Sequence, residues 1–351
     1  MNILSFHGID ILGISACVPK TLVENSQFGK DLFPDEAQLK KTIETIGVVQ
    51  RRVCNDSMCT SDLCYAAAES IIEEMNVDRS EIDVVIFVSQ TPDYKLPATS
   101  VLLQNRLGLS NKTISFDVNL GCSGYVYGLS IAYSFAKNDN IRKVLLLVGD
   151  SPTKFVSKQD TSSALLFGDA GSATLIEDTG SNSNTFFNLY SDGSGSQTLI
   201  IPSGGYRNIS SVSSLESKID DDGNARNQEQ LFMSGGDIFN FTLREVPRSI
   251  KELLDFSKTE LQDIDQFVFH QANKFMIEFL RKKIKIDTSK FVMSLENYGN
   301  TSSTSIPLTL VINNDDIKYG QTLLSGFGVG LSWGNCYVNL GKTKIIKLLE
   351  I

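Results

Sequence analysis

Cys122 is the residue in this sequence best placed to act as a nucleophile. Residues 113–120 are typical of a strand, Gly121-Cys122-Ser123-Gly124 of a tight turn, and the chain from Tyr125 onward of a helix. Glycine permits backbone conformations that other residues resist, and a helix N-terminus stabilises a thiolate and lowers the pKa of the thiol. Most single cysteines are buried and unreactive, but this strand-to-helix turn favours a cysteine that forms covalent intermediates.

His270 is the better placed of the two histidines for chemistry. His7 lies among the first few residues, whereas His270 ends an apolar strand and precedes the polar break Gln271-Ala272-Asn273. Active sites of α/β proteins are built where strands end. A lone histidine in such a place is about as often structural, so His270 needs a chemical partner.

Asn300 offers an amide donor within the polar run at residues 297–307, and a helix starting near Ser302 would hold it rigidly. Asn300-Thr301-Ser302 is formally a glycosylation signal, but glycosylation requires secretion.

The glycine-rich turn at residues 326–330 has two interpretations. It either lends a backbone N–H to an oxyanion or lets two chain segments approach closely.

The other cysteines do not form a metal-binding motif. Cys54, Cys59 and Cys64 recur every five residues, whereas zinc sites use pairs two to four residues apart. Six cysteines in 351 residues are few, and a cytoplasmic chain keeps them reduced. We expect neither a metal ion nor a disulfide framework.

The arrangement of the chain predicts an α/β protein with two related halves. Strand-like residues 84–88 and 143–148 alternate with helix-like residues 61–75 and 124–137. Residues 81–87 also resemble residues 263–269, and Ile82 and Ile264 lie 182 positions apart, about half the chain. Each copy follows an amphipathic helix and enters a buried strand, which indicates a duplicated unit.

The predicted halves are residues 1–176, which contain Cys122, and residues 177–351, which contain His270 and Asn300. A polar segment at about 178–230 is rich in Ser, Asn, Gly and Asp. Polar stretches of this length are commonly functional lids or surface excursions. We interpret this one as an insertion over the substrate entrance.

Charge and hydropathy exclude several classes of function. The 32 basic and 41 acidic side chains give a net charge of −9, which argues against nucleic acid and anionic membrane as partners. The sequence has no basic signal segment and no apolar stretch near the ~20 residues that span a bilayer, so we expect a cytoplasmic protein. The basic run Arg281-Lys282-Lys283-Ile284-Lys285 is either a local docking patch or a solvated helix end.

Three motifs in this order resemble the β-ketoacyl-acyl-carrier-protein synthase III family of the thiolase superfamily: residues 117–128 around Cys122, His270-Gln271-Ala272-Asn273, and Tyr298-Gly299-Asn300-Thr301-Ser302. The likeness covers nearly the whole chain, including Phe167-Gly168-Asp169-Ala170-Gly171. It implies a duplicated five-layer α-β-α-β-α thiolase-like fold and a homodimer.

The resemblance also implies a Cys-His-Asn catalytic triad of Cys122, His270 and Asn300. In the implied reaction Cys122 accepts an acyl group from a thioester, while the backbone N–H groups of Cys122 and Val329 hold the oxyanion. His270 and Asn300 then hold the carbonyl of malonyl-acyl carrier protein as it loses carbon dioxide, and the enolate attacks the acyl-cysteine. No resident cofactor is implied, because acyl-coenzyme A or acyl-carrier thioesters are substrates.

By the same resemblance, Phe327 packs beside Cys122, and Leu96 reaches from one subunit into the acyl pocket of the other. Leu96 replaces a bulkier aromatic residue, which suggests a different or longer primer. The expected carrier-docking cations are Lys274, Arg281, Lys282 and Lys283.

Three further positions depart from the family pattern. Lys41 and Thr45 stand where well-known members have a tryptophan and an arginine that clamp coenzyme A, and Phe275 replaces a carrier-gripping arginine. The sequence leaves open whether coenzyme A or a carrier protein delivers the acyl group, and which pathway uses the product.

Three other functions compete with condensation. A papain-like hydrolase also uses Cys, His and Asn, but Gly121-Cys122-Ser123-Gly124-Tyr125 lacks the second cysteine and the tryptophan of that motif. A superfamily relative that passes the acyl group to a hydroxyl or amine without decarboxylation is the main alternative. An inactive scaffold is a weaker one, because the triad residues are intact.

Overall fold

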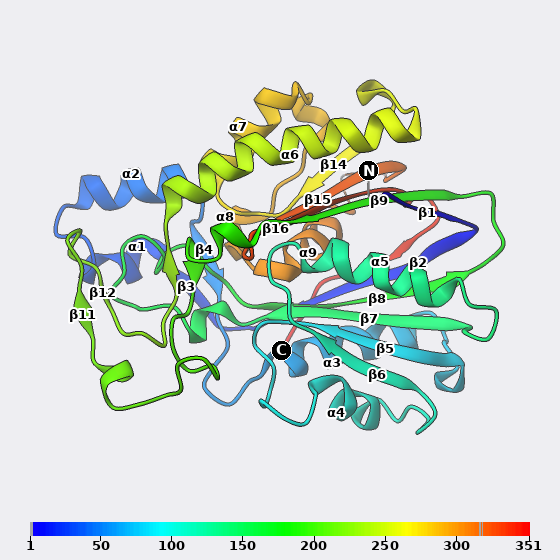
Figure 1. Ribbon diagram of the computed structural model, residues 1–351, viewed down its shortest axis with the longest axis horizontal. Helices are drawn as coiled ribbons and strands as arrows, with labels where there is room; N and C mark the ends of the chain where they lie inside the picture. Colours follow the sequence, from blue (N-terminus) through cyan, green and yellow to red (C-terminus); the bar gives the residue numbers. More distant parts are fainter. Residues whose placement is uncertain (1–2, 316, 318) are drawn as a thin grey trace.

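The computed structural model describes residues 3–315, 317 and 319–351. Two β-sheets face each other, with one layer of helices between them and a further layer outside each sheet (Figure 1). The outer helices are α3 (Thr60–Glu74) and α4 (Thr99–Arg106) on one side, and α6 (Gly235–Ser257) and α7 (Lys274–Ile284) on the other. The layer between the sheets holds α5 (Gly124–Ala136) and α9 (Ser305–Ile312). This arrangement confirms the predicted five-layer α/β fold.

The first sheet has seven strands in the order β17-β2-β8-β7-β5-β6, with β18 also pairing with β2. β5 lies parallel to both β6 and β7, whereas β8 runs antiparallel to β7 and β2. The strands are β2 (Ile9–Val18), β5 (Ile82–Val88), β6 (Ile114–Val118), β7 (Lys143–Asp150), β8 (Ala170–Asp178), β17 (Lys344–Ile345) and β18 (Leu349–Glu350).

The second sheet has five strands in the order β1-β9-β16-β15-β14. Only β14 and β15 are parallel neighbours in it. The strands are β1 (Ile3–His7), β9 (Asn184–Ser191), β14 (Gln266–Phe269), β15 (Gln321–Gly328) and β16 (Ser332–Asn339).

Each sheet contains a strand from the opposite end of the sequence. β1 pairs with β9 in the second sheet, and β17 and β18 pair with β2 in the first. The division at residue 176 therefore stays a prediction, since each of the two large sheets contains strands from both predicted halves.

The two copies of the predicted repeat have matching surroundings. β5 follows α3 and a short 3₁₀ turn at Arg79–Glu81, and β14 follows α6 and a 3₁₀ turn at Leu261–Asp263. Both strands are almost fully buried and have a parallel neighbour. The resemblance between residues 81–87 and 263–269 thus corresponds to repeated structure.

The polar excursion begins later in the chain than residue 178. Residues 184–191 form β9, whose Phe187 is fully buried between the sheets, so this stretch belongs to the framework. The excursion itself follows β9 and contains short strands, β10 (Leu199–Ile200), β11 (Lys218–Ile219), β12 (Ala225–Arg226) and β13 (Phe232–Met233). The turn at residues 180–184 before β9 is as rich in Ser and Asn as the excursion itself, so composition does not distinguish the strand from the excursion.

The remaining helices and strands cover one end of the molecule, beside the excursion (Figure 1). They are α1 (Asn25–Phe28), α2 (Glu36–Ile46), β3 (Leu22–Glu24), β4 (Gln50–Arg52) and α8 (Leu295–Tyr298). Within the described ranges, no helix combines the length and apolarity needed to cross a membrane.

Candidate active site

Cys122 lies at a turn between a strand and a buried helix, as predicted. β6 ends at Val118, the N–H of Gly124 donates to the carbonyl of Gly121 over 2.6 Å, and α5 begins at Gly124. α5 is apolar on all sides because it lies between the two sheets. Because Cys122 lies two residues before this buried helix, its backbone is held in place, and its side chain is only 8% exposed.

The turn between β15 and β16 approaches Cys122 closely. A Cβ added at Gly328 would lie 2.6 Å from the Cβ of Cys122 and 2.8 Å from its Sγ. The backbone of Val329 in the same turn acts to lower the pKa of the Cys122 thiol, which is the direction expected of an N–H that faces the sulfur. The glycine-rich turn therefore brings two chain segments together and also presents a backbone donor, so both interpretations of its sequence apply.

We expect Gly328→Ala to slow acylation of Cys122 at least about tenfold and to destabilise the fold by about 1–3 kcal/mol, because the added methyl overpacks the turn. The turn has to shift away from the sulfur and take the Val329 N–H with it. Acyl-adduct formation by mass spectrometry and Tm by calorimetry measure the two effects. Gly236→Ala is the control, because a Cβ there meets nothing within 4 Å; equal loss in both variants would contradict the prediction.

The pKa of the Cys122 thiol is raised to about 11, mainly by burial and further by the negative charge of Asp150. The N–H groups of Val329 and Cys122 and the Ser302 hydroxyl act in the opposite direction. The expectation of a lowered pKa is thus wrong for the resting protein, because desolvation of the thiolate outweighs the helix and its donors.

We therefore expect alkylation of Cys122 by iodoacetamide to accelerate about tenfold per pH unit from pH 7 to 10, because only the thiolate reacts and it remains the minor form below pH 11. Peptide mass spectrometry resolves Cys122 from the other thiols at each pH. A rate that levels off below pH 8 would show that the thiolate is already the main form and would disprove this prediction.

His270 follows directly after β14 and is buried, with 2% of its surface exposed. Burial lowers the pKa of its imidazole to about 3, so the ring is neutral at physiological pH. Its Nδ1 lies 2.8 Å from the Ser305 hydroxyl, which already accepts the N–H of Gln271 over 3.3 Å. We infer that Ser305 donates its hydrogen to Nδ1, which leaves the ring proton on Nε2.

Asn300 is held in place by contacts from both predicted halves. Its Oδ1 accepts the N–H of Ser302 over 2.9 Å, and its Nδ2 donates to the carbonyl of Ala272 over 3.3 Å. Its own carbonyl accepts the N–H of Gly168 over 3.1 Å. The side chain is 5% exposed, and one of its two amide hydrogens has no protein acceptor in the described structure.

Ser302 connects these residues and was not among the predicted site residues. It has a positive φ of 51°, its hydroxyl acts to lower the pKa of the Cys122 thiol, and its backbone acts to raise the pKa of the His270 imidazole. Its N–H binds Asn300. The Ser/Thr run after Asn300 was the available signal, but only the fold reveals which hydroxyl faces the sulfur.

The two predicted pocket residues lie in different surroundings. Phe327 is 1% exposed and packs edge-on against His270, with ring centroids 5.5 Å apart. Leu96 is 77% exposed on the loop before α4. Within one chain, Phe327 therefore belongs to the site and Leu96 does not.

The four predicted docking cations lie on α7, but they are not equivalent. Arg281 is only 13% exposed and pairs with Glu278, which makes it a poor docking residue. Lys274, Lys282 and Lys283 are exposed. Phe275 is 54% exposed and stacks on Phe239 of α6 over 5.4 Å, so the position of the family arginine carries an aromatic cluster.

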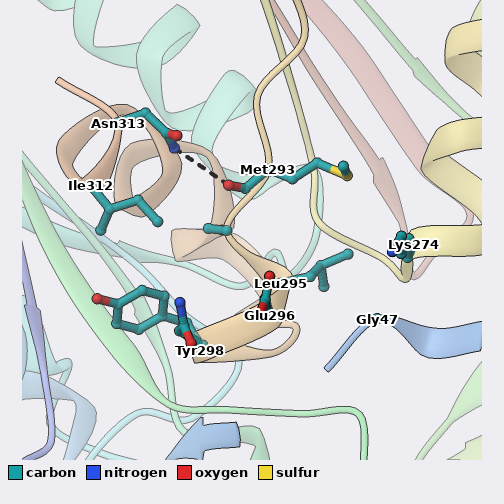
Figure 2. Close-up of a pocket in the computed structure, with 10 residues that line it drawn as sticks. Gly47, Lys274, Met293, Leu295, Glu296, Tyr298, Ile312 and Asn313 are labelled. Atoms are coloured by element: carbon teal, nitrogen blue, oxygen red, sulfur yellow. Dashed lines mark hydrogen bonds between the residues drawn. The ribbon is translucent and has the colours of Figure 1, made fainter. Parts of the chain in front are cut away.

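A groove of about 350 Å³ lies beside α8 (Figure 2). Lys274 at the start of α7 forms one side, and Glu296 and Tyr298 of α8 form another. None of Cys122, His270 and Asn300 lines it. The groove is thus separate from the buried cluster around Cys122.

No grouping of three or more His, Cys, Asp or Glu side chains within the described residues has a geometry suited to a metal ion. Cys54, Cys59 and Cys64 are free thiols, with Cys54 lying 3.6 Å from the Ser151 hydroxyl.

Comparison with known proteins identifies the family. The model described as 3-oxoacyl-[acyl-carrier-protein (ACP)] synthase III matches residues 116–193, and the model of its C-terminal region matches residues 254–340. The beta-ketoacyl-[acyl-carrier-protein] synthase III of Ehrlichia canis is 33% identical over 338 residues, which are 94% of this chain and 98% of the relative. The chain belongs to the 3-oxoacyl-[acyl-carrier-protein] synthase III family.

Solved structures of the synthase III family agree with this assignment. A 3-oxoacyl-(acyl-carrier protein) synthase from Burkholderia xenovorans LB400 has 35% identity and a TM-score of 0.92, covering 100% of this chain and 99% of that one. A second 3-oxoacyl-(acyl-carrier-protein) synthase III has 38% identity and a TM-score of 0.89, covering 94% and 99%. The two family models contain Cys122 in one and His270 and Asn300 in the other.

Proposed function

We propose that this synthase III family member catalyses decarboxylative Claisen condensation of a Cys122-bound acyl primer with malonyl-acyl carrier protein. The product is a 3-oxoacyl-acyl carrier protein. The observation that carries the proposal is the burial of Cys122, His270 and Asn300 around Ser302, which donates its N–H to Asn300 and acts on the pKa values of both Cys122 and His270. A nucleophile and two neutral donors in one buried cluster match the requirements of this reaction.

In the first step, the sulfur of Cys122 attacks the thioester carbonyl of the primer. The backbone N–H groups of Cys122 and Val329, which act to lower the pKa of the thiol at rest, stabilise the oxyanion during the attack. The leaving thiol departs with the proton of the Cys122 thiol, and the acyl group remains on the sulfur.

In the second step, Nε2–H of His270 and the free amide hydrogen of Asn300 hold the carbonyl oxygen of the malonyl thioester. Loss of carbon dioxide leaves an enolate, whose charge these two donors stabilise. The enolate attacks the acyl carbonyl and expels the Cys122 thiolate. Burial of His270 and Asn300 strengthens both hydrogen bonds because competing water is excluded.

We also propose that the enzyme acts as a homodimer. β6 is the edge strand of the seven-stranded sheet, and Tyr94 and Leu96 nearby are 61% and 77% exposed. Apolar side chains and a free strand edge of this kind favour pairing with a second copy. In that dimer, Leu96 enters the acyl pocket of the partner.

The proposed carrier surface consists of Lys274, Lys282, Lys283 and the exposed Phe275 on α7. The lysines attract an acidic carrier, and Phe275 offers apolar contact in place of an arginine.

Lys41 and Thr45 lie on α2, where the Thr45 hydroxyl bonds to the carbonyl of Lys41 over 2.7 Å. Because neither side chain can clamp an adenine ring, we favour a carrier thioester over coenzyme A as the primer donor.

The test is incubation with acyl-coenzyme A and acyl-carrier thioesters of varied chain length, followed by mass analysis of the Cys122 peptide. Malonyl-carrier protein labelled in its free carboxyl group is then added, and released carbon dioxide is counted. Acylation at Cys122 followed by carbon dioxide release supports condensation. Acyl transfer to a hydroxyl or amine without carbon dioxide favours the alternative acyltransferase, and no adduct from any donor favours a scaffold.

A further inference from the structure

The proposed mechanism leaves one buried carboxylate without a role. Asp150, the last residue of β7, is 1% exposed. Its Oδ1 accepts the N–H of Gln90 over 2.7 Å and the hydroxyl of Ser89 over 3.2 Å. Its Oδ2 accepts two donors of Ser303, the hydroxyl over 2.6 Å and the N–H over 3.2 Å. Four donors therefore hold the carboxylate in the interior, where a charged group without hydrogen bonds would be costly.

Ser303 lies in the 3₁₀ turn Ser302–Thr304, which connects Asn300 to α9. Ser302 in this turn has a φ of 51°, in the left-handed region that residues other than glycine rarely adopt. Such a conformation persists only where surrounding contacts impose it. The contacts that hold the turn to the seven-stranded sheet are the two bonds from Ser303 to Asp150 and the Thr304 hydroxyl, which donates to two backbone carbonyls over 3.1 Å each.

The residue with the left-handed backbone also orients the Asn300 amide. The N–H of Ser302 donates to Oδ1 of Asn300 over 2.9 Å. Rotation about the last side-chain bond of asparagine is soft, so an amide without such a partner can turn and exchange the positions of its oxygen and nitrogen. Because an N–H can bond only to the oxygen, Ser302 keeps Oδ1 on its own side and leaves Nδ2, with its free hydrogen, on the other.

We propose that Asp150 is a positioning residue for the decarboxylation step. By holding Ser303, its carboxylate keeps Ser302 at its left-handed φ, and the Ser302 N–H keeps the free amide hydrogen of Asn300 directed toward the malonyl carbonyl. The inference rests on the proposed function, which gives Asn300 one of the two hydrogen bonds to the enolate oxygen. The four donors on Asp150 all belong to the protein, so its effect on the reaction passes through the turn.

The other enolate donor is positioned independently of Asp150. Nδ1 of His270 lies 2.8 Å from the hydroxyl of Ser305, the first residue of α9. The helix holds Ser305, whose carbonyl accepts the Thr309 hydroxyl over 2.6 Å. Loss of the Asp150 contact should therefore misplace Asn300 and leave His270 in place, whereas a general loss of packing would disturb both.

The first test compares full-length Asp150→Asn and Ser303→Ala with Ser15→Ala. Ser303→Ala removes the 2.6 Å bond to the carboxylate, and Asp150→Asn replaces one acceptor oxygen by an NH₂ group. We expect release of labelled carbon dioxide from malonyl-carrier protein to fall about tenfold in both variants, and acylation of Cys122 to change less than about twofold. Ser15 is the matched control, because it is a fully buried serine of β2 whose hydroxyl donates to the carbonyl of Ala67 on α3.

The second test places Ser303→Ala on two backgrounds. On Asn300→Ala the amide that the turn orients is gone, so Ser303→Ala should add less than about a twofold loss of decarboxylation. On His270→Ala the Asn300 amide is still present, and the full loss of about tenfold should remain. Equal further losses on both backgrounds would show that Ser303 only stabilises the fold, and would overturn the proposal.

A crystal structure of Asp150→Asn without substrate separates this inference from the proposed function. We expect Ser302 to leave the left-handed region, or its N–H to move out of hydrogen-bond distance of the Asn300 Oδ1. The proposal is overturned if both features remain, or if Asp150→Asn and Ser303→Ala decarboxylate like Ser15→Ala. Absence of carbon dioxide release by the unmodified protein would instead overturn the proposed function, and the crystal structure would still decide whether Asp150 sets the turn.

Discussion

Cys122→Ala should abolish acyl-adduct formation and lower condensation by more than about 10³-fold, because no other group in the cluster can carry the acyl chain. The change removes one buried sulfur and leaves the strand-to-helix turn intact. Intact-protein mass after incubation with an acyl thioester measures the adduct, and turnover with malonyl-carrier protein measures the rate.

Cys336→Ala is the matched control for this variant. Cys336 is a fully buried cysteine in β16 and belongs to the core between the sheets. We expect it to retain acylation. An adduct of undiminished amount on the Cys122→Ala protein would show that a different residue is the nucleophile.

His270→Ala should separate the two steps. The groups that lower the pKa of the Cys122 thiol are those of Val329, Ser302 and Cys122 itself, and His270 is not among them, so acylation should continue at nearly its normal rate. Decarboxylation of malonyl-carrier protein should fall about 10²- to 10³-fold, because one of the two enolate donors is lost. Release of labelled carbon dioxide measures the rate of decarboxylation, and acyl-adduct formation measures the rate of acylation.

The only other histidine supplies the control. His7 lies in β1, and its Nδ1 contacts Asn184 over 3.1 Å, so His7→Ala should leave both steps unchanged. Because the pKa of His270 is about 3, its protonation should cause no loss of condensation between pH 8 and pH 5. An equal loss of acylation and decarboxylation in His270→Ala would contradict the assigned role.

Local patterns were sufficient to predict the parts of the site that depend on neighbouring residues in sequence. Glycines on both sides of Cys122 predict its turn, and the apolar run before His270 predicts its strand end. The repeat at residues 81–87 and 263–269 predicts two equivalent strands, and each has the same 3₁₀ turn before it.

Features that depend on distant residues were not predictable in this way. Asp150 and Ser303 meet although they lie 153 positions apart, and nothing near either residue signals the contact. The raised pKa of Cys122 depends on how completely the surrounding layers exclude water.

The exchange of terminal strands has a consequence for synthesis on the ribosome. β2 is paired on one side by β8, but its other neighbours are residues 344–350, which follow the entire second sheet in the sequence. Domains commonly fold from the N-terminus as the nascent chain emerges. Here the first sheet cannot be completed while the second is being made, so its β2 edge remains exposed throughout translation and is a natural binding surface for chaperones.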